Sequence, residues 1–142
     1  MSEVSALSKK VVGLAMKVHS VLGPGFLESV YQNALLIEMR HAGLVAEAGK
    51  EIAVHYCGEI VGRFLADVFV RDPANDEQLL IENKAVSALV VAHSVQLVNY
   101  LTATQLDQGL LLNFGASSLE FKTKHRRPPG SQSPPELIPE IP

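Results

Sequence analysis

The stretch "LLIENKAV", residues 79–86, places two charged residues, Glu82 and Lys84, inside a short apolar run. An apolar run of this length indicates a buried strand, in which an unpaired charge is destabilising. Side chains alternate along a strand, so Leu80, Glu82 and Lys84 share one face and the residues between them share the other. The two charges therefore either form an ion pair on an exposed sheet face or belong to a site.

The preceding segment supplies a partner strand with a charge of its own. "EIAVHYC" (51–57) and "IVGRFLADVFVR" (60–71) both alternate, and Gly58-Glu59 between them predicts the turn of a hairpin. The alternation assigns Phe64, Ala66, Val68 and Val70 to one face of the second strand, and Leu65, Asp67 and Phe69 to the other. Asp67 can then meet Glu82 and Lys84 if the two strands pair.

The remaining periodicities predict helices over residues 4–22, 26–41 and 91–105, and strands over 109–114 and 119–125. The first of these two strands is apolar throughout, which is typical of a buried strand, and the second alternates like an edge strand. The order of elements predicts an α/β (α+β) fold, in which a central mixed β-sheet is flanked by helices.

The composition indicates one soluble globular domain without a membrane span. Of the 142 residues, 47% are hydrophobic and 19% are charged, and no apolar run approaches the ~20 residues that cross a bilayer. We predict a single domain over residues 1–127 and a disordered, Pro-rich tail over 128–142. The lone Cys57 and an N-terminus without the layout of a secretory signal favour a cytoplasmic location.

The charge distribution leaves nucleic-acid binding open. A net charge of −3 excludes a global basic field, but basic residues crowd together near the end of the predicted domain. They are Lys122, Lys124, Arg126 and Arg127. This cluster is either a local patch for phosphates or the solvated edge of the sheet.

Three carboxylates, Glu28, Asp67 and Glu82, can converge with Lys84 at one end of the predicted sheet. Two carboxylates ~4 Å apart repel by ~4 kcal/mol at an effective dielectric of ~20, and one lysine offsets only part of three negative charges. Oxygen donors of this kind select Mg²⁺ or Mn²⁺ rather than zinc. The competing interpretation of Glu28 is a residue favoured by the dipole of a helix N-terminus.

The segment "GPGFLESVY" (23–31) resembles the signature of the GxxExxY family, with Gly25, Glu28 and Tyr31 at the defining positions. The resemblance continues through "YCGEIVGRFLADVFV", "IENKAV", "HSVQLVNYLTAT" and "GLLLNFG", and covers roughly residues 8–127. That family is similar to the PD-(D/E)XK nuclease superfamily, so the resemblance implies a restriction-endonuclease-like fold. Two departures are Asn83, where an aliphatic residue is usual, and Ser94-Val95 before Gln96.

The resemblance implies hydrolysis of phosphodiester bonds in nucleic acid with Mg²⁺ (or Mn²⁺) as cofactor. The catalytic residues it implies are Asp67, Glu82, Lys84 and Gln96, and the metal ligands are Glu28, Asp67 and Glu82. We interpret Tyr31, Tyr100, Lys122 and Lys124 as substrate contacts.

Two other functions use the same fold and stay open at this point. The first is a catalytically inactive module that binds nucleic acid or a protein, which the acidic pI favours. The second is a sensor of a small ligand or metal. The positive mean hydropathy and the long apolar helices also predict a homodimer.

Overall fold

The computed structural model describes residues 4–126, which form a five-stranded sheet with helices on both faces. The helices are α1 (Ala6–Leu22), α2 (Glu28–His41) and α3 (Val91–Thr104). The strands are β1 (Val45–Tyr56), β2 (Glu59–Asp72), β3 (Glu77–Lys84), β4 (Gln108–Asn113) and β5 (Glu120–His125). The predicted mixed sheet flanked by helices is confirmed, and the predicted tail over 128–142 lies outside the described residues.

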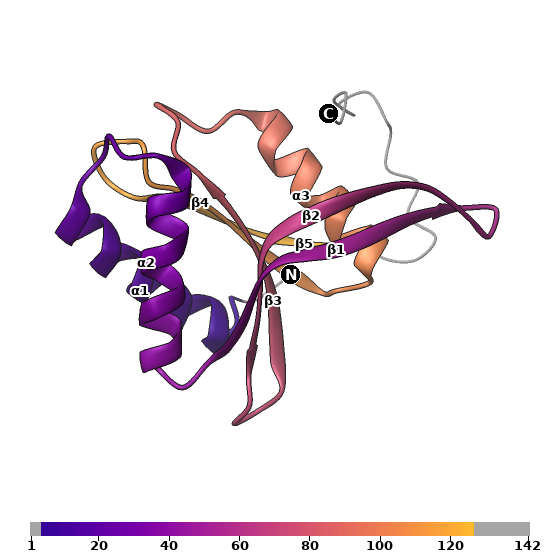
Figure 1. Ribbon diagram of the computed structural model, residues 1–142, viewed down its shortest axis with the longest axis horizontal. Coiled ribbons are helices and arrows are strands. Elements are labelled where there is room, and N and C mark those ends of the chain that lie inside the picture. The colour runs from indigo at the N-terminus through magenta and orange to yellow at the C-terminus, as the bar shows by residue number, and fades with distance from the viewer. Residues whose placement is uncertain (1–3, 127–142) are drawn as a thin grey trace.

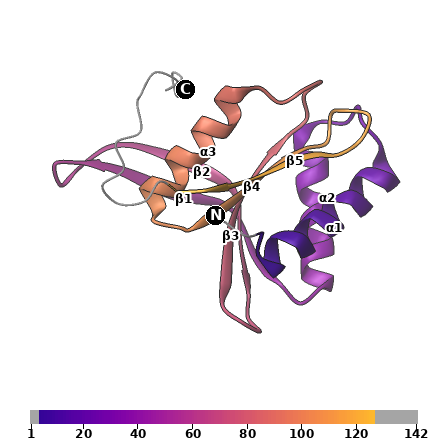
Figure 2. The ribbon, with the colours of Figure 1, turned by 180° about the vertical axis from the view of Figure 1, so that it is seen from behind.

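The strands lie in the order β1-β2-β3-β4-β5, and only β3 and β4 are parallel. Helix α3 makes the crossover between these two strands and covers one face of the sheet, while α1 and α2 cover the other (Figures 1 and 2). Each face has its own core. We call them the α1–α2 core, which contains Val68, Leu79 and Ile81, and the α3 core, which contains Leu80, Leu97 and Tyr100.

The hairpin of β1 and β2 differs from the prediction at both ends. Strand β1 begins at Val45, six residues before the predicted start, because the Ala- and Gly-containing segment 45–50 has a weak strand signal. Tyr56 pairs with Glu59, so the turn consists of Cys57 and Gly58 rather than Gly58-Glu59. Both turn residues have positive φ angles, 52° and 80°, as a two-residue type I′ connection requires.

The regular alternation of side chains predicted for β2 is wrong at Asp67, because the even-numbered residues before it and after it lie on opposite faces of the sheet. Val68 and Val70 belong to the α1–α2 core as the alternation requires, but Phe64 and Ala66 lie against the α3 core. On β1, Gly49 lies opposite Asp67, between the pairs Ala48–Val68 and Lys50–Ala66, and has a φ angle of 69°. A left-handed residue inside a strand kinks the strand, and glycine adopts this conformation without steric strain. The outer half of the hairpin therefore turns toward α3 (Figure 1).

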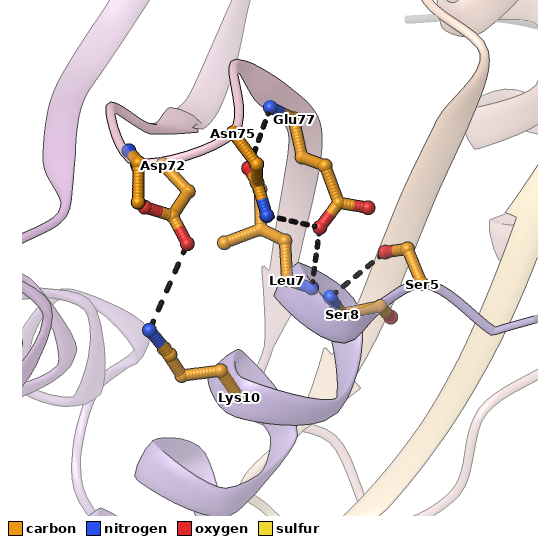
Figure 3. Close-up of polar contacts among 8 residues, drawn as sticks. Ser5, Leu7, Ser8, Lys10, Asp72, Asn75 and Glu77 are labelled. Carbon is orange, nitrogen blue, oxygen red and sulfur yellow. Dashed lines mark hydrogen bonds and ion pairs between the residues drawn. The ribbon is translucent and has the colours of Figure 1, made fainter.

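A polar network attaches the start of α1 to the turn between β2 and β3 (Figure 3). Ser5 Oγ accepts a hydrogen bond from the Ser8 N–H, and Glu77 Oε1 accepts one from the Leu7 N–H at 3.1 Å. These bonds satisfy two of the amide groups that every helix leaves unpaired at its N-terminus. Lys10 Nζ also lies 3.7 Å from Asp72 Oδ2. A residue 70 positions away along the chain thus caps α1 and fixes it on the sheet.

Replacing Glu77 with alanine should lower the free energy of unfolding by about 1–2 kcal/mol, because the Leu7 N–H loses its acceptor. Thermal or urea unfolding measures the loss. Glu77→Gln is the matched control, since its side-chain oxygen can still accept from Leu7 and should retain most of the stability. Equal losses in the two variants would show that the charge of Glu77, rather than the cap, is responsible.

Candidate metal and phosphodiester site

Asp67 and Glu82 meet where strands β2 and β3 separate. The regular backbone pairing between these strands ends at Val68–Ile81. Beyond that point, hydrogen bonds between side chains and backbone N–H groups connect the two strands. The Asn83 N–H donates to Asp67 Oδ2 at 2.7 Å, and the Asp67 N–H donates to Glu82 Oε1 at 3.4 Å. The hairpin is kinked where Gly49 of β1 lies opposite Asp67, and the β2–β3 ladder ends at the next pair. These two features bring the carboxyl groups of Asp67 and Glu82 together.

The environment of this carboxylate pair disfavours two negative charges. Burial, followed by the charge of Asp67, raises the pKa of Glu82 to about 8. Burial also raises the pKa of Asp67, although the bond from the Asn83 N–H and the charge of Lys84 oppose the rise. The pair is close enough to share a hydrogen bond between its carboxyl groups. A cation at this position would relieve the repulsion.

Glu28 lies in the first turn of α2 and faces the same site. Partial burial, followed by the charge of Asp67, raises the pKa of Glu28, and the charge of Lys84 opposes the rise. Among residues 4–126, no three side chains of His, Cys, Asp or Glu are grouped closely enough to hold a metal ion. Glu28 is therefore a neighbour of the carboxylate pair and does not complete a three-carboxylate cage.

The donor set nevertheless fits Mg²⁺. Mg²⁺ typically binds one or two carboxylates, keeps several waters and takes further oxygens from a phosphate, so it does not need a cage made only of protein groups. Asp67 and Glu82 could supply these carboxylates, and Glu28 is a third carboxyl group within range of the charge of Asp67. Burial is the largest cause of the raised pKa of all three carboxyl groups, so their joint ionisation is unfavourable without a bound cation.

Lys84 is the cation of the site. Its charge opposes the raised pKa values of Glu28, Asp67 and Glu82, so its ammonium group lies near all three. Within the described residues it forms no ion pair or hydrogen bond through its side chain, so the ammonium is available to a ligand. The alternation of β3 is as predicted, since Leu80 lies in the α3 core while Leu79 and Ile81 lie in the α1–α2 core.

Tyr31 is placed in the structure as a buried support. Its side chain is 0% exposed and stacks on Phe114 with ring centroids 4.8 Å apart. Its hydroxyl donates to the Gly23 carbonyl at 2.5 Å and accepts from the Phe26 N–H at 3.1 Å. These bonds fix the loop before α2, and hence the turn that carries Glu28. This geometry favours a structural role over the predicted contact with substrate.

Gln96 and Tyr100 lie on α3, on the side of the sheet that carries Glu82. Tyr100 stacks on Phe64 of β2 with ring centroids 3.6 Å apart. Burial, then the charges of Glu82 and Asp67, raises the pKa of Tyr100, so its ring lies next to the carboxylate pair. Gln96, one helical turn earlier, is half-buried and has no hydrogen bond to Lys84 among the described residues.

Lys122 and Lys124 lie on the edge strand β5. They pair with Leu111 and Gly109 of β4, and Leu111 belongs to the α3 core, so both lysines are on the α3 side of the sheet. Neither forms an ion pair with another described residue. The edge position predicted for this strand is confirmed, and a contact of these lysines with phosphate stays a prediction.

His93 is a site neighbour that was not predicted from the sequence. Burial, followed by the charge of Lys84, lowers its pKa, so the imidazole is within range of the charge of Lys84. The spacing to Gln96 and Tyr100, three and seven residues, was a signal in the sequence that could have identified it.

Asn113 was also missed. It is fully buried, and its side-chain amide accepts a hydrogen bond from the Val86 N–H and donates one to the Val86 carbonyl.

A pocket of about 780 Å³ lies between the outer half of the hairpin and α3. Val54, Phe64, Asn99, Tyr100 and Gln105 are among its lining residues. Because Tyr100 borders both this pocket and the carboxylate pair, the pocket adjoins the site without containing the carboxylates.

Comparison with known proteins agrees with this architecture. The family model of the PD-(D/E)XK nuclease superfamily matches residues 5–127, and the chain belongs to this superfamily. A solved structure described as "Crystal structure of SSO0001" matches with a TM-score of 0.55 and 18% identity, over 83% of this chain and 59% of that chain. The chain thus spans less than two thirds of that structure, which supports the fold alone. No curated protein matches the sequence.

Among the described residues, none of the helices has the length and apolar character needed to cross a membrane.

Proposed function

We propose that the protein is a Mg²⁺-dependent nuclease that hydrolyses phosphodiester bonds in nucleic acid. The observation that carries this proposal is the contact between the half-buried Asp67 and the buried Glu82, whose joint ionisation the site disfavours in the absence of a cation, beside a lysine without a partner among the described residues. The family of the chain supports it. We further propose that the chain belongs to the GxxExxY group, that Mn²⁺ can replace Mg²⁺, and that the protein acts in the cytoplasm.

Each side chain has a separate task in the proposed reaction. Asp67 and Glu82 would hold the metal, with Glu28 acting through water. When bound, the metal polarises the phosphate and lowers the pKa of a water ligand. Lys84 orients the attacking water or stabilises the negative charge that develops on the phosphate. Gln96 and Tyr100 would line the site from α3, with Tyr100 nearer to the carboxylate pair.

Incubation with single-stranded and duplex DNA and RNA, with Mg²⁺ or Mn²⁺ and with a chelator, tests the reaction directly. Lys84→Met should reduce metal-dependent cleavage by about 10²–10³-fold, because it removes the positive charge that faces the phosphate. Unfolding should change little, since the methionine keeps the length of the apolar stem. Lys9→Met, at an exposed lysine of α1, is the control and should cleave like the wild type. Wild-type protein that cleaves none of these substrates would exclude the proposed reaction.

The stability of the metal-free protein should fall as the pH rises from 4.5 to about 8. The folded state holds the proton of Glu82 up to about pH 8, whereas the unfolded state releases it near 4.5, so the folded state binds more protons in this interval. We expect a loss of roughly 1–4 kcal/mol across it. Unfolding curves across this range measure the effect, and Glu82→Gln should flatten it.

Mg²⁺ should reverse this loss, because it binds the deprotonated carboxylates. The unfolding midpoint should therefore rise with Mg²⁺ at pH above 8 and change little near pH 4.5. An equal response to Mg²⁺ in Glu82→Gln would show that the metal binds elsewhere.

The pocket between the hairpin and α3 favours a second candidate function, a sensor of a small ligand. Its volume of about 780 Å³ is in the range of small-molecule sites, and its lining combines aromatic rings with amide side chains. A thermal-shift screen of nucleotides and other small metabolites separates the two candidates. Stabilisation by a small ligand without cleavage of any nucleic acid would favour the sensor.

We also propose that the protein is a homodimer in which the second copy packs on the hairpin. The hairpin projects beyond the rest of the molecule, and Tyr56, Val61 and Leu65 are 71%, 64% and 64% exposed (Figure 1). The two charged residues Glu51 and Arg63 of the hairpin pair with each other at 3.4 Å, so this pair presents no net charge to a second copy. The molar mass from light scattering tests this proposal, and a monomeric mass would exclude it.

A further inference from the structure

His93, Gln96 and Tyr100 form a stripe along α3, because offsets of three and four residues return to the same side of a helix. At one end of the stripe, Tyr100 lies beside Glu82 and Asp67, as their effect on its pKa indicates. At the other end, His93 lies one turn before Leu97, which packs in the α3 core, and is within range of the charge of Lys84. The stripe therefore runs along the candidate site from the carboxylate pair to the lysine, and His93 is its last member.

The backbone at the start of α3 determines which nitrogen of His93 carries a proton. The Val90 N–H donates to His93 Nδ1 at 3.2 Å, and the His93 N–H donates to the Val90 carbonyl at 3.0 Å. A ring nitrogen that accepts a hydrogen bond is unprotonated, so the neutral imidazole carries its proton on Nε2. No described residue accepts a hydrogen bond from Nε2, and the side chain is half-buried. Nε2–H is thus a free donor next to an ammonium group.

We propose that His93 is a substrate-binding residue that donates Nε2–H to a phosphate oxygen of a nucleic acid held beside Lys84. The substrate class rests on the proposed function. A phosphate oxygen is the acceptor that suits this position, because it is attracted by Lys84 and can accept several hydrogen bonds at once. A neutral donor also avoids the repulsion that a second cation would meet beside Lys84.

The chain offers substitutions that separate binding from capping. Glutamate and glutamine at the third position of a helix can accept a hydrogen bond from the N-cap amide, so both preserve the cap on Val90. Glutamate has no donor for phosphate, whereas glutamine keeps an amide donor. His41→Glu is the charge-matched control, since His41 is exposed at the end of α2 opposite to Glu28.

Fluorescence anisotropy with labelled oligonucleotides should be measured in the Asp67→Asn background, in which no cleavage is expected, together with thermal unfolding. His93→Glu should bind at least ~10-fold more weakly with an unchanged unfolding midpoint, His93→Gln should stay within ~3-fold of the parent, and His41→Glu should bind like the parent. If His93→Glu binds as tightly as His41→Glu, His93 is only a cap and the proposal is wrong.

The outcomes also separate this proposal from the proposed function. If the wild type cleaves with Mg²⁺ but His93→Glu shows unaltered binding, the nuclease assignment is supported and the proposed role of His93 is wrong. If the wild type cleaves nothing but binds nucleic acid in a manner that depends on His93, the nuclease assignment falls and His93 remains part of a binding site. Absence of any binding by the parent would overturn the role of His93.

Discussion

Asp67→Asn should abolish Mg²⁺-dependent cleavage, with a loss of at least ~10³-fold in rate, and should leave the protein as stable as the wild type or more stable at about pH 8. The asparagine side chain has nearly the same shape, and its oxygen can still accept the hydrogen bond from the Asn83 N–H. The substitution removes a charge that raises the pKa of Glu82, so Glu82 can ionise in the folded protein with less repulsion. Activity and stability therefore change in opposite directions.

Cleavage assays and thermal unfolding at two pH values test both parts of this prediction. Asp76→Asn is the matched control, because the exposed Asp76 lies on the turn after β2 and pairs with the half-buried Arg71. Its positive φ angle of 64° suits asparagine, so neither activity nor stability should change. Cleavage by Asp67→Asn at the wild-type rate would remove Asp67 from the site. A marked loss of stability would show that the carboxylate is held by contacts stronger than the repulsion.

The strand that contains "LLIENKAV" was predictable because its sequence pattern matches its position between two layers of helices. A buried strand between two layers of helices must alternate between two cores, and Leu79, Leu80 and Ile81 do so. The neighbouring strand follows directly along the chain through a short turn, so pairing it with β3 was the simplest topology. These two facts predict that Asp67 lies near Glu82, whereas their contact also depends on the kink opposite Gly49 and on the end of the ladder.

What the sequence pattern could not show depends on contacts between distant residues. The exchange of faces at Asp67 depends on the left-handed conformation of Gly49 on another strand, and a period of two assumes a regular backbone. The burial of Tyr31 depends on Phe114, which follows β4 and is distant from Tyr31 along the chain. Helical spacing places Tyr31 on the same face as Glu28 but carries no information on depth. His93 was likewise missed because a single histidine in a helix has many ordinary roles.

Gly115→Ala should lower the free energy of unfolding by about 3 kcal/mol or more and should also impair cleavage. A Cβ atom at this position would lie 2.4 Å from the Val86 carbonyl oxygen and 2.6 Å from the Ala85 carbonyl carbon, both of which are backbone atoms. Val86 cannot move away freely, because the buried Asn113 side chain holds its N–H and its carbonyl at 2.9 Å each. The Phe114 N–H also donates to the Lys84 carbonyl, so a shift of this segment displaces the lysine of the site.

Gly13→Ala provides the same substitution where the structure has room. Gly13 lies on the exposed side of α1, and no atom lies within 4 Å of an added Cβ. Alanine is a better helix former than glycine, so this variant should gain about 0.5–1 kcal/mol and cleave like the wild type. Urea unfolding and the cleavage assay on both variants measure the contrast. If Gly115→Ala unfolds at the wild-type midpoint, the contact between β4 and the segment after Lys84 is looser than the packing indicates. If it is destabilised but cleaves at the wild-type rate, the position of Lys84 does not depend on this contact.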